Sequence, residues 1–218
     1  SETADKAKDL LEGKPWDSPQ RPSGGSEDFL WNPDSTQLLY VTKPLSGAEY
    51  AQSTNTDIFA YDLKSGTVKN LTESNKGYDV NPKFSPDGKY LSWQSMERNG
   101  FEADKNDVKI LDLKSGITTN LTKAWDESVV GSVFWSQDSK NIYFTTAWKG
   151  TMQLFSLNRK TSKIQQVTKG DFDVSDIYAE NSNSLLVSRT DMNHNADLFS
   201  VDVKNGAMKQ LTEVNKDT

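Results

Sequence analysis

The fold of this chain is decided by a short motif that occurs four times: Asn70-Leu71-Thr72, Asn120-Leu121-Thr122, Gln166-Val167-Thr168 and Gln210-Leu211-Thr212. Each copy has a side-chain amide, then an aliphatic residue, then a threonine, and successive copies are 50, 46 and 44 residues apart. A repeat of about 40 to 50 residues with strand-like content is typical of the blades of a β-propeller. The repeat therefore predicts an all-β chain built from consecutive blades.

Two kinds of turn mark the inside of each repeat. The first follows an aromatic residue, and its copies are Trp31-Asn32-Pro33-Asp34-Ser35, Phe84-Ser85-Pro86-Asp87-Gly88, Trp135-Ser136-Gln137-Asp138-Ser139 and the more divergent Tyr178-Ala179-Glu180-Asn181-Ser182. The second closes another hairpin, and its copies are Asp62-Leu63-Lys64-Ser65-Gly66, Asp112-Leu113-Lys114-Ser115-Gly116, Asn158-Arg159-Lys160-Thr161-Ser162 and Asp202-Val203-Lys204-Asn205-Gly206. Proline presets φ at a turn, Asp or Asn bonds to the backbone two residues on, and Gly accepts the conformation that follows. Both turns therefore predict antiparallel hairpins.

The segments between these turns have the patterns of β-strands. The second strand of each blade is predicted at Gln37–Thr42, Tyr90–Gln94, Asn141–Thr145 and Ser184–Ser188. A first strand carries the aromatic residue, a third strand precedes the second turn, and a fourth strand ends at the repeated motif. Each repeat is thus predicted to be a four-stranded antiparallel blade, and we place the blades at 29–72, 81–122, 132–168 and 175–212.

The N-terminal residues indicate that the ring of blades is incomplete. Lys8-Asp9-Leu10-Leu11 has the pattern of Lys69-Asn70-Leu71-Thr72, so residues 1–28 are predicted to hold the last strand of a preceding blade plus a linker. We expect an open fragment of a larger propeller, with about four blades present and the total left open. Its exposed strand edges and apolar faces could pair with a second copy of the chain, giving a homodimer.

The overall composition narrows the function. Of the 218 residues 34% are hydrophobic, which suits one repeat-built domain, and the net charge of −6 makes nucleic acid an unexpected partner. We find no run that approaches the ~20 apolar residues needed to span a membrane. The chain has no cysteine, and its single histidine, His194, lies in a polar segment and is expected to be a solvated loop residue. The motifs indicate no cofactor and no metal site.

One face of the predicted propeller is the candidate functional face. Loops between second and third strands lie there, opposite the short turns, and they are predicted at 43–56, 95–106, 147–151 and 190–195. Long loops on a rigid scaffold commonly carry binding sites. Loop 95–106 contains Glu97, Arg98 and Glu102, and carboxylates in a partly dry pocket can bind the ammonium group of a peptide. The alternative is a solvated hairpin loop with internal ion pairs that contribute little energy.

Taken together, the turns and the Leu-Thr motif resemble the propeller repeats of TolB and of the prolyl oligopeptidase family of serine peptidases. The more specific stretches are Ser53-Thr54-Asn55-Thr56-Asp57-Ile58, Gly77-Tyr78-Asp79-Val80-Asn81-Pro82 and Ser92-Trp93-Gln94-Ser95-Met96-Glu97-Arg98-Asn99-Gly100-Phe101-Glu102. They resemble the N-terminal propeller of the bacterial dipeptidyl peptidase V group in that family. The resemblance covers nearly the whole chain.

The resemblance implies that this propeller gates and positions peptides for an α/β-hydrolase domain with a Ser-Asp-His triad. It implies a serine exopeptidase that removes dipeptides from free N-termini in an extracytoplasmic, periplasmic setting. The peptide's amino group needs an anchor, for which Glu97, Arg98 and Glu102 are the candidates. The chain lacks the Gly-x-Ser-x-Gly nucleophile motif, and Gly24-Gly25-Ser26-Glu27-Asp28 lacks the closing glycine. We therefore expect no catalytic residue in this chain.

Two other functions fit the same turns. A non-enzymatic TolB-like propeller would be a docking platform for a protein partner in the bacterial envelope. A propeller with its own active site in the channel would need several carboxylates on its first strands, which offer mainly aromatic residues and Asp176. A hydrolase domain encoded downstream would favour the peptidase, and an early stop codon would favour the docking platform.

Overall fold

The computed structural model describes residues 7–20, 24–131 and 133–214, and within them every strand belongs to one of four antiparallel sheets of four strands. The sheets consist of β1 (Phe29–Trp31), β2 (Gln37–Thr42), β3 (Asp57–Asp62) and β4 (Val68–Asn70), then β5 (Asp79–Phe84), β6 (Tyr90–Ser95), β7 (Asp107–Asp112) and β8 (Thr118–Asn120), then β9 (Val133–Trp135), β10 (Asn141–Trp148), β11 (Thr151–Asn158) and β12 (Ile164–Gln166), and finally β13 (Asp173–Asn181), β14 (Ser184–Thr190), β15 (Asp197–Asp202) and β16 (Met208–Gln210). Strand order within each sheet follows the sequence. The predicted all-β propeller with four-stranded blades is confirmed.

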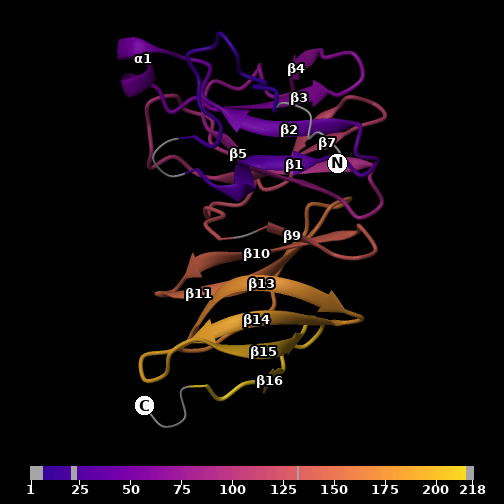
Figure 1. Cartoon of the computed structure of the whole chain (residues 1–218). Coiled ribbons are helices and arrows are strands. Elements are labelled where there is room, and N and C mark those ends of the chain that lie inside the picture. Colours follow the sequence, from indigo (N-terminus) through magenta and orange to yellow (C-terminus); the bar gives the residue numbers. More distant parts are fainter. Residues whose placement is uncertain (1–6, 21–23, 132, 215–218) are drawn as a thin grey trace.

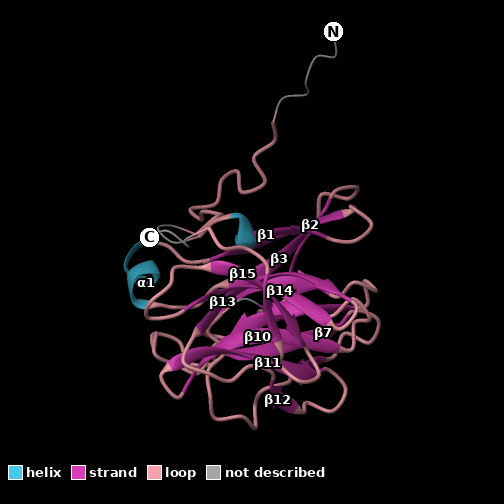
Figure 2. Cartoon of the chain, turned by 90° about the horizontal axis from the view of Figure 1, so that it is seen from below, coloured by secondary structure: helices cyan, strands magenta, loops and turns pink. Residues whose placement is uncertain are grey.

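The blades succeed one another in chain order, from β1–β4 at the top of Figure 1 to β13–β16 at the bottom. Successive blades are neighbours, because β3 contacts β5, β5 contacts β9 and β11 contacts β13. Two short helices, η1 (Ser26–Asp28) and α1 (Gly47–Gln52), lie outside the stacked strands (Figure 2). The four blades form an open arc, as expected for part of a larger propeller.

The repeated threonine joins the end of the fourth strand of each blade to the beginning of the third strand. In the second blade, the Thr122 hydroxyl donates to Asp107 Oδ1 at 2.7 Å and accepts the Val108 N–H at 3.0 Å. The same two-way bond joins Thr72 to Asp57 in the first blade and Thr168 to Gln153 in the third. It recurs at Thr212 and Asp197 in the fourth blade. A buried N–H and a buried oxygen both need a partner, and a hydroxyl serves both because it donates and accepts at a single atom.

The second turn motif also forms as predicted. Asp62 Oδ1 accepts the backbone N–H groups of Lys64 and Ser65 at 3.1 and 2.8 Å, and the divergent third copy uses Asn158 Oδ1 in the same way. Gly66 has a φ of 71°, a left-handed conformation that glycine adopts without a steric penalty. These local bonds explain why the motif is read so clearly from sequence.

The core lies between blades. Leu39 and Val41 of β2 pack with Ile58 of β3 against Leu91 and Trp93 of the next blade, and all five are at most 2% exposed. Because side chains alternate across a strand, each blade offers one face to its predecessor and the other to its successor. Broad rings such as Trp93 fill the space between the twisted sheets.

Residues Lys8–Leu11, predicted as the last strand of a preceding blade, form a loop and a turn in this structure. A strand needs a hydrogen-bonded neighbour, and residues 7–20 instead lie on the outer face of the first blade. Leu10, Leu11 and Trp16 pack there on an aromatic cluster made of Tyr40, Phe59 and Tyr61. Whether this segment belongs to a further blade stays a prediction.

The long loops gather on one face, as predicted. β2, β10 and β14 all point toward the side on which α1 lies, the left in Figure 1. The loop predicted at 147–151 is an exception, because Lys149 and Gly150 form a tight two-residue hairpin turn with φ of 53° and 89°. The candidate functional face is therefore built mainly from the loops of the first two blades.

Candidate functional site, an acidic pocket on the long-loop face

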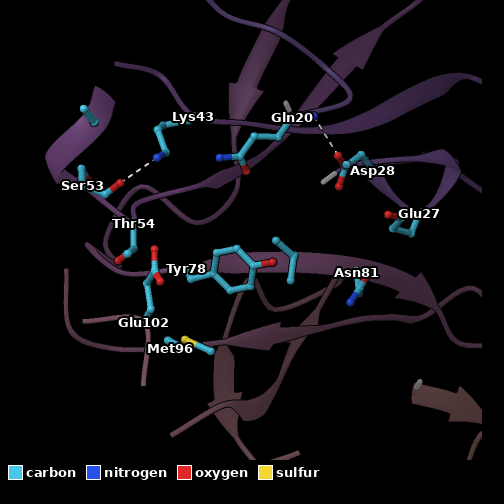
Figure 3. Close-up of a pocket in the computed structure, with 13 residues that line it drawn as sticks. Gln20, Glu27, Asp28, Lys43, Ser53, Thr54, Tyr78, Asn81, Met96 and Glu102 are labelled. Carbon is cyan, nitrogen blue, oxygen red and sulfur yellow. Dashed lines mark hydrogen bonds between the residues drawn. The ribbon is translucent and has the colours of Figure 1, made fainter. Parts of the chain in front are cut away.

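A pocket of about 480 Å³ opens on this face at the boundary between the first and second blades. Four parts of the chain form its walls: the segment before β1, the β2–β3 loop, the beginning of β5 and the β6–β7 loop (Figure 3). Its lining residues are Gln20, Gly24, Glu27, Asp28, Lys43, Ala51, Ser53, Thr54, Tyr78, Val80, Asn81, Met96 and Glu102. We call this cavity the acidic pocket.

Three carboxylates and one lysine set the charge of the acidic pocket. Glu27 and Asp28 line one end and Glu102 the other, and Lys43 lies at the same end as Glu102 (Figure 3). The Lys43 ammonium already donates to the carbonyl oxygens of Ser53 and Tyr50, at 2.6 and 3.0 Å. These bonds orient the ammonium group without neutralising it, so the lining presents three carboxylates and one cation.

Lys43 holds the β2–β3 loop against the first blade. Its Nζ lies 4.4 Å from the centre of the Tyr50 ring, which gives a cation–π contact in addition to the two carbonyl bonds. Burial lowers the pKa of Lys43, while the negative charge of Glu102 acts in the opposite direction. The residue therefore braces α1 and the loop around it.

Asp28 is the buried acid of the pocket, with 4% of its surface exposed. Its Oδ2 accepts the Gln20 N–H at 3.0 Å, and burial raises the pKa of its carboxyl group. Gly24 makes this possible, because a Cβ there would lie 2.1 Å from Asp28 Oδ2. Burial is the main cause that raises the pKa of Tyr78, and the negative charges of Asp28 and Glu27 act in the same direction.

The three predicted site residues separate in the structure. Glu102 lines the acidic pocket, whereas Glu97 and Arg98 are outside its lining. The Arg98 guanidinium is bound within its own loop, since Nη2 lies 2.8 Å from Asp104 Oδ1 and the group stacks 4.2 Å from the Phe101 ring centre. Hydrogen bonds from the Arg98 side chain are the main cause that lowers the pKa of Asp104 to about 2. Arg98 thus forms an ion pair within its own loop, whereas Glu102 lines the acidic pocket.

Sequence reasoning missed Glu27, Asp28, Lys43 and Tyr78. The signal for the first two was present: a Gly-Gly pair, then two adjacent acids directly before a first strand. Such a segment can turn tightly and place a carboxylate beside the start of the first strand of a blade. Nothing in the local pattern, however, indicates that the turn faces a loop more than 70 residues further along the chain.

Other chemistry finds little support in the described residues. His194 is exposed, and its Nδ1 lies 2.8 Å from Asp191 Oδ1 in the same loop. Across residues 7–20, 24–131 and 133–214, no three His, Asp or Glu side chains are grouped to hold a metal ion. The described helices include none with the length and apolar character needed to cross a membrane.

Comparison with known proteins places this geometry in context. A family model described as the TolB β-propeller domain matches residues 30–218. Dipeptidyl-peptidase 5 of Porphyromonas gingivalis is 40% identical over 96% of this chain, and Dipeptidyl-peptidase 5 of Porphyromonas endodontalis is 38% identical over 97%. The chain spans 30% of the length of each of these relatives.

Solved structures share the fold at much lower identity. The structure of a puromycin-hydrolysing peptidase of Mycobacterium tuberculosis superposes with a TM-score of 0.66 and 16% sequence identity. The match covers 86% of this chain and 31% of that one. At this identity the likeness concerns the arrangement of the blades alone.

Proposed function

This chain belongs to the TolB β-propeller domain family, and we propose that it serves as the substrate-positioning propeller of a dipeptidyl peptidase. Support comes from relatives named Dipeptidyl-peptidase 5, at 40% and 38% identity over almost the whole chain. Those relatives are more than three times longer than the matched segment. The proposal includes a hydrolase domain with a Ser-Asp-His triad elsewhere in the gene's complete product, which would act in an extracytoplasmic setting.

The observation that carries this proposal is the acidic pocket. A free peptide N-terminus is largely a cation at neutral pH, because its ordinary pKa is about 8. Glu27, Asp28 and Glu102 supply acceptors for that cation, and charge-assisted hydrogen bonds are stronger than neutral ones. The Lys43 ammonium, which interacts electrostatically with Glu102, offsets part of this negative charge, and the lining still holds three carboxylates to one cation. The pocket thus suits a short extended peptide that enters amino end first.

The volume and position of the pocket fit a positioning role. A cavity of about 480 Å³ lies at the lower end of the size range for small-ligand sites and excludes a folded protein. It opens on the long-loop face, so a domain lying over that face would meet the peptide as it leaves the pocket. The propeller would hold the N-terminus, and the second domain would cleave.

The test is a pair of substrates used on the gene's complete product. One is a dipeptide anilide with a free amino group, and the other is the same compound with hydrogen in place of that group. Glu102→Gln should raise KM for the first by about fivefold, the range of an exposed ion pair, and leave the second unchanged. Glu127→Gln, an exposed acid in a link between blades and outside the pocket lining, is the matched control.

The opposite results are equally clear. Equal losses with both substrates, or no loss with either, would mean that Glu102 does not bind the amino group. A complete product with no hydrolase domain and no turnover would favour the docking platform.

A further inference from the structure

The β6–β7 loop, which carries Glu102, is held in place by contacts at three points. The first is its base, at Met96. The Met96 N–H donates to the Tyr78 carbonyl at 2.8 Å, and the Met96 carbonyl accepts the Asn75 side chain at 2.9 Å. Gly77 packs so closely here that a Cβ would lie 2.3 Å from the Met96 oxygen. These contacts at Met96 fix the direction in which the loop leaves β6.

The second point is Asp104, which ties the two arms of the loop together. Its Oδ2 accepts the N–H groups of Glu97 and Arg98 at 3.0 and 2.7 Å, and its Oδ1 accepts Arg98 Nε at 2.9 Å. The Arg98 guanidinium then covers the Phe101 ring. Glu102 thus stands on a loop whose outward and return arms are held together.

The third point is the tip of the loop, and it crosses the boundary between blades. Asn99 Oδ1 accepts the Ser53 hydroxyl at 2.6 Å and the Thr54 N–H at 3.0 Å. The Gly100 N–H donates in return to Thr54 Oγ1 at 2.9 Å. Ser53 and Thr54 belong to the β2–β3 loop and line the acidic pocket, and the Ser53 carbonyl also binds Lys43.

We infer that Asn99 is a positioning residue for recognition of the peptide amino group. It joins the loop that carries Glu102 to the loop that carries Ser53, so it sets how far Glu102 stands from Lys43 and Asp28 across the pocket. This inference rests on the proposed function of the pocket. Asn99 and Gly100 are exposed, so their contacts contribute little to the packing of the blades. Their effect is to limit the motion of one carboxylate relative to the opposite wall.

Residues that act through another residue show non-additive effects, and this gives a sharp test on the complete gene product with the free-amine dipeptide anilide. Asn99→Ala should raise KM about two- to fivefold, with kcat within about twofold, since it cannot cost more than the ion pair it positions. The double variant Asn99→Ala with Glu102→Gln should match Glu102→Gln alone. Asn99→Asp keeps the Oδ1 acceptor and should restore the KM of the unmodified protein.

Two further variants guard the result. Thr54→Val removes the acceptor for the Gly100 N–H from the other side of the contact, and it should reproduce the rise in KM if Asn99→Ala does not fold. Asn193→Ala, in the corresponding exposed loop of the fourth blade, should change nothing. Thermal unfolding of each variant separates a loss of fold from a loss of positioning.

The outcomes separate the two claims. An unchanged KM in Asn99→Ala, together with a raised KM in Glu102→Gln, would overturn the positioning role alone. Effects on KM that simply add in the double variant would overturn it as well. A null result for Glu102→Gln itself would overturn the proposed function of the pocket, and with it this inference.

Discussion

Replacing Thr122 by valine tests whether the repeated motif stabilises the fold for the reason the structure gives. Valine keeps the shape and removes the hydroxyl, which donates to Asp107 Oδ1 at 2.7 Å and accepts the Val108 N–H at 3.0 Å. Thr122 has no exposed surface, so water cannot replace either bond. Loss of a hydrogen bond to a charged group and of a partner for a buried N–H should cost about 2–3 kcal/mol. In a domain of this size that lowers Tm by roughly 4–12 °C.

The third blade supplies the internal control. Thr168 makes the same pair of bonds, but its acceptor is the neutral Gln153 Oε1 at 2.8 Å. Since bonds to neutral groups contribute less, Thr168→Val should cost about 1 kcal/mol less than Thr122→Val. Both free energies come from urea unfolding followed by circular dichroism, with a common m-value as the check that unfolding remains comparable. A cost below about 0.5 kcal/mol for Thr122→Val, or an equal or larger cost for Thr168→Val, would refute the reasoning.

Two more predictions follow from buried groups. Burial raises the pKa of Asp79 to about 6 from its ordinary 3.8, although Trp93 Nε1 donates to it at 2.7 Å. The folded state therefore favours the protonated acid, and its contribution to stability, present below about pH 4, is lost as pH rises through about 6. The unmodified protein should lose about 2 kcal/mol relative to Asp79→Asn between pH 4 and pH 7 in denaturant unfolding, and a difference independent of pH would contradict this. Gly24→Ala should push Asp28 out of place, because the new Cβ would lie 2.1 Å from Oδ2; calorimetry should show weaker binding of a free-amine dipeptide amide, and unchanged affinity would exclude Asp28 from the site.

Much of the fold could be predicted from local pattern. The strand predicted at Gln37–Thr42 has the same bounds as β2, and the turn at Asp62 forms through bonds to residues two and three positions away. Such features depend on neighbours in the chain, so their signal stays within a few residues. The long loop predicted at 147–151 does not form. Lys149 and Gly150 adopt left-handed conformations, and these two residues alone close the hairpin.

The candidate site depends more than the fold on contacts between distant parts of the chain. Position on one long loop predicts Glu97, Arg98 and Glu102 together. The structure shows that Arg98 binds Asp104, six residues away, while Glu102 reaches the pocket. Sequence spacing cannot separate these outcomes, because both depend on how the loop folds over Phe101.

The sequence by itself determined the repeat, the four-stranded blades and the face on which the long loops lie, since each of these follows from periodicity and turn chemistry within one repeat. The tertiary structure alone decided that Asp28, Lys43 and Glu102 surround one cavity. Blade stacking brings these three residues together, and the angle and distance between blades depend on how side chains such as Leu39 and Trp93 fill the space between the sheets. No single repeat contains that information, because the acidic pocket exists only where two blades meet.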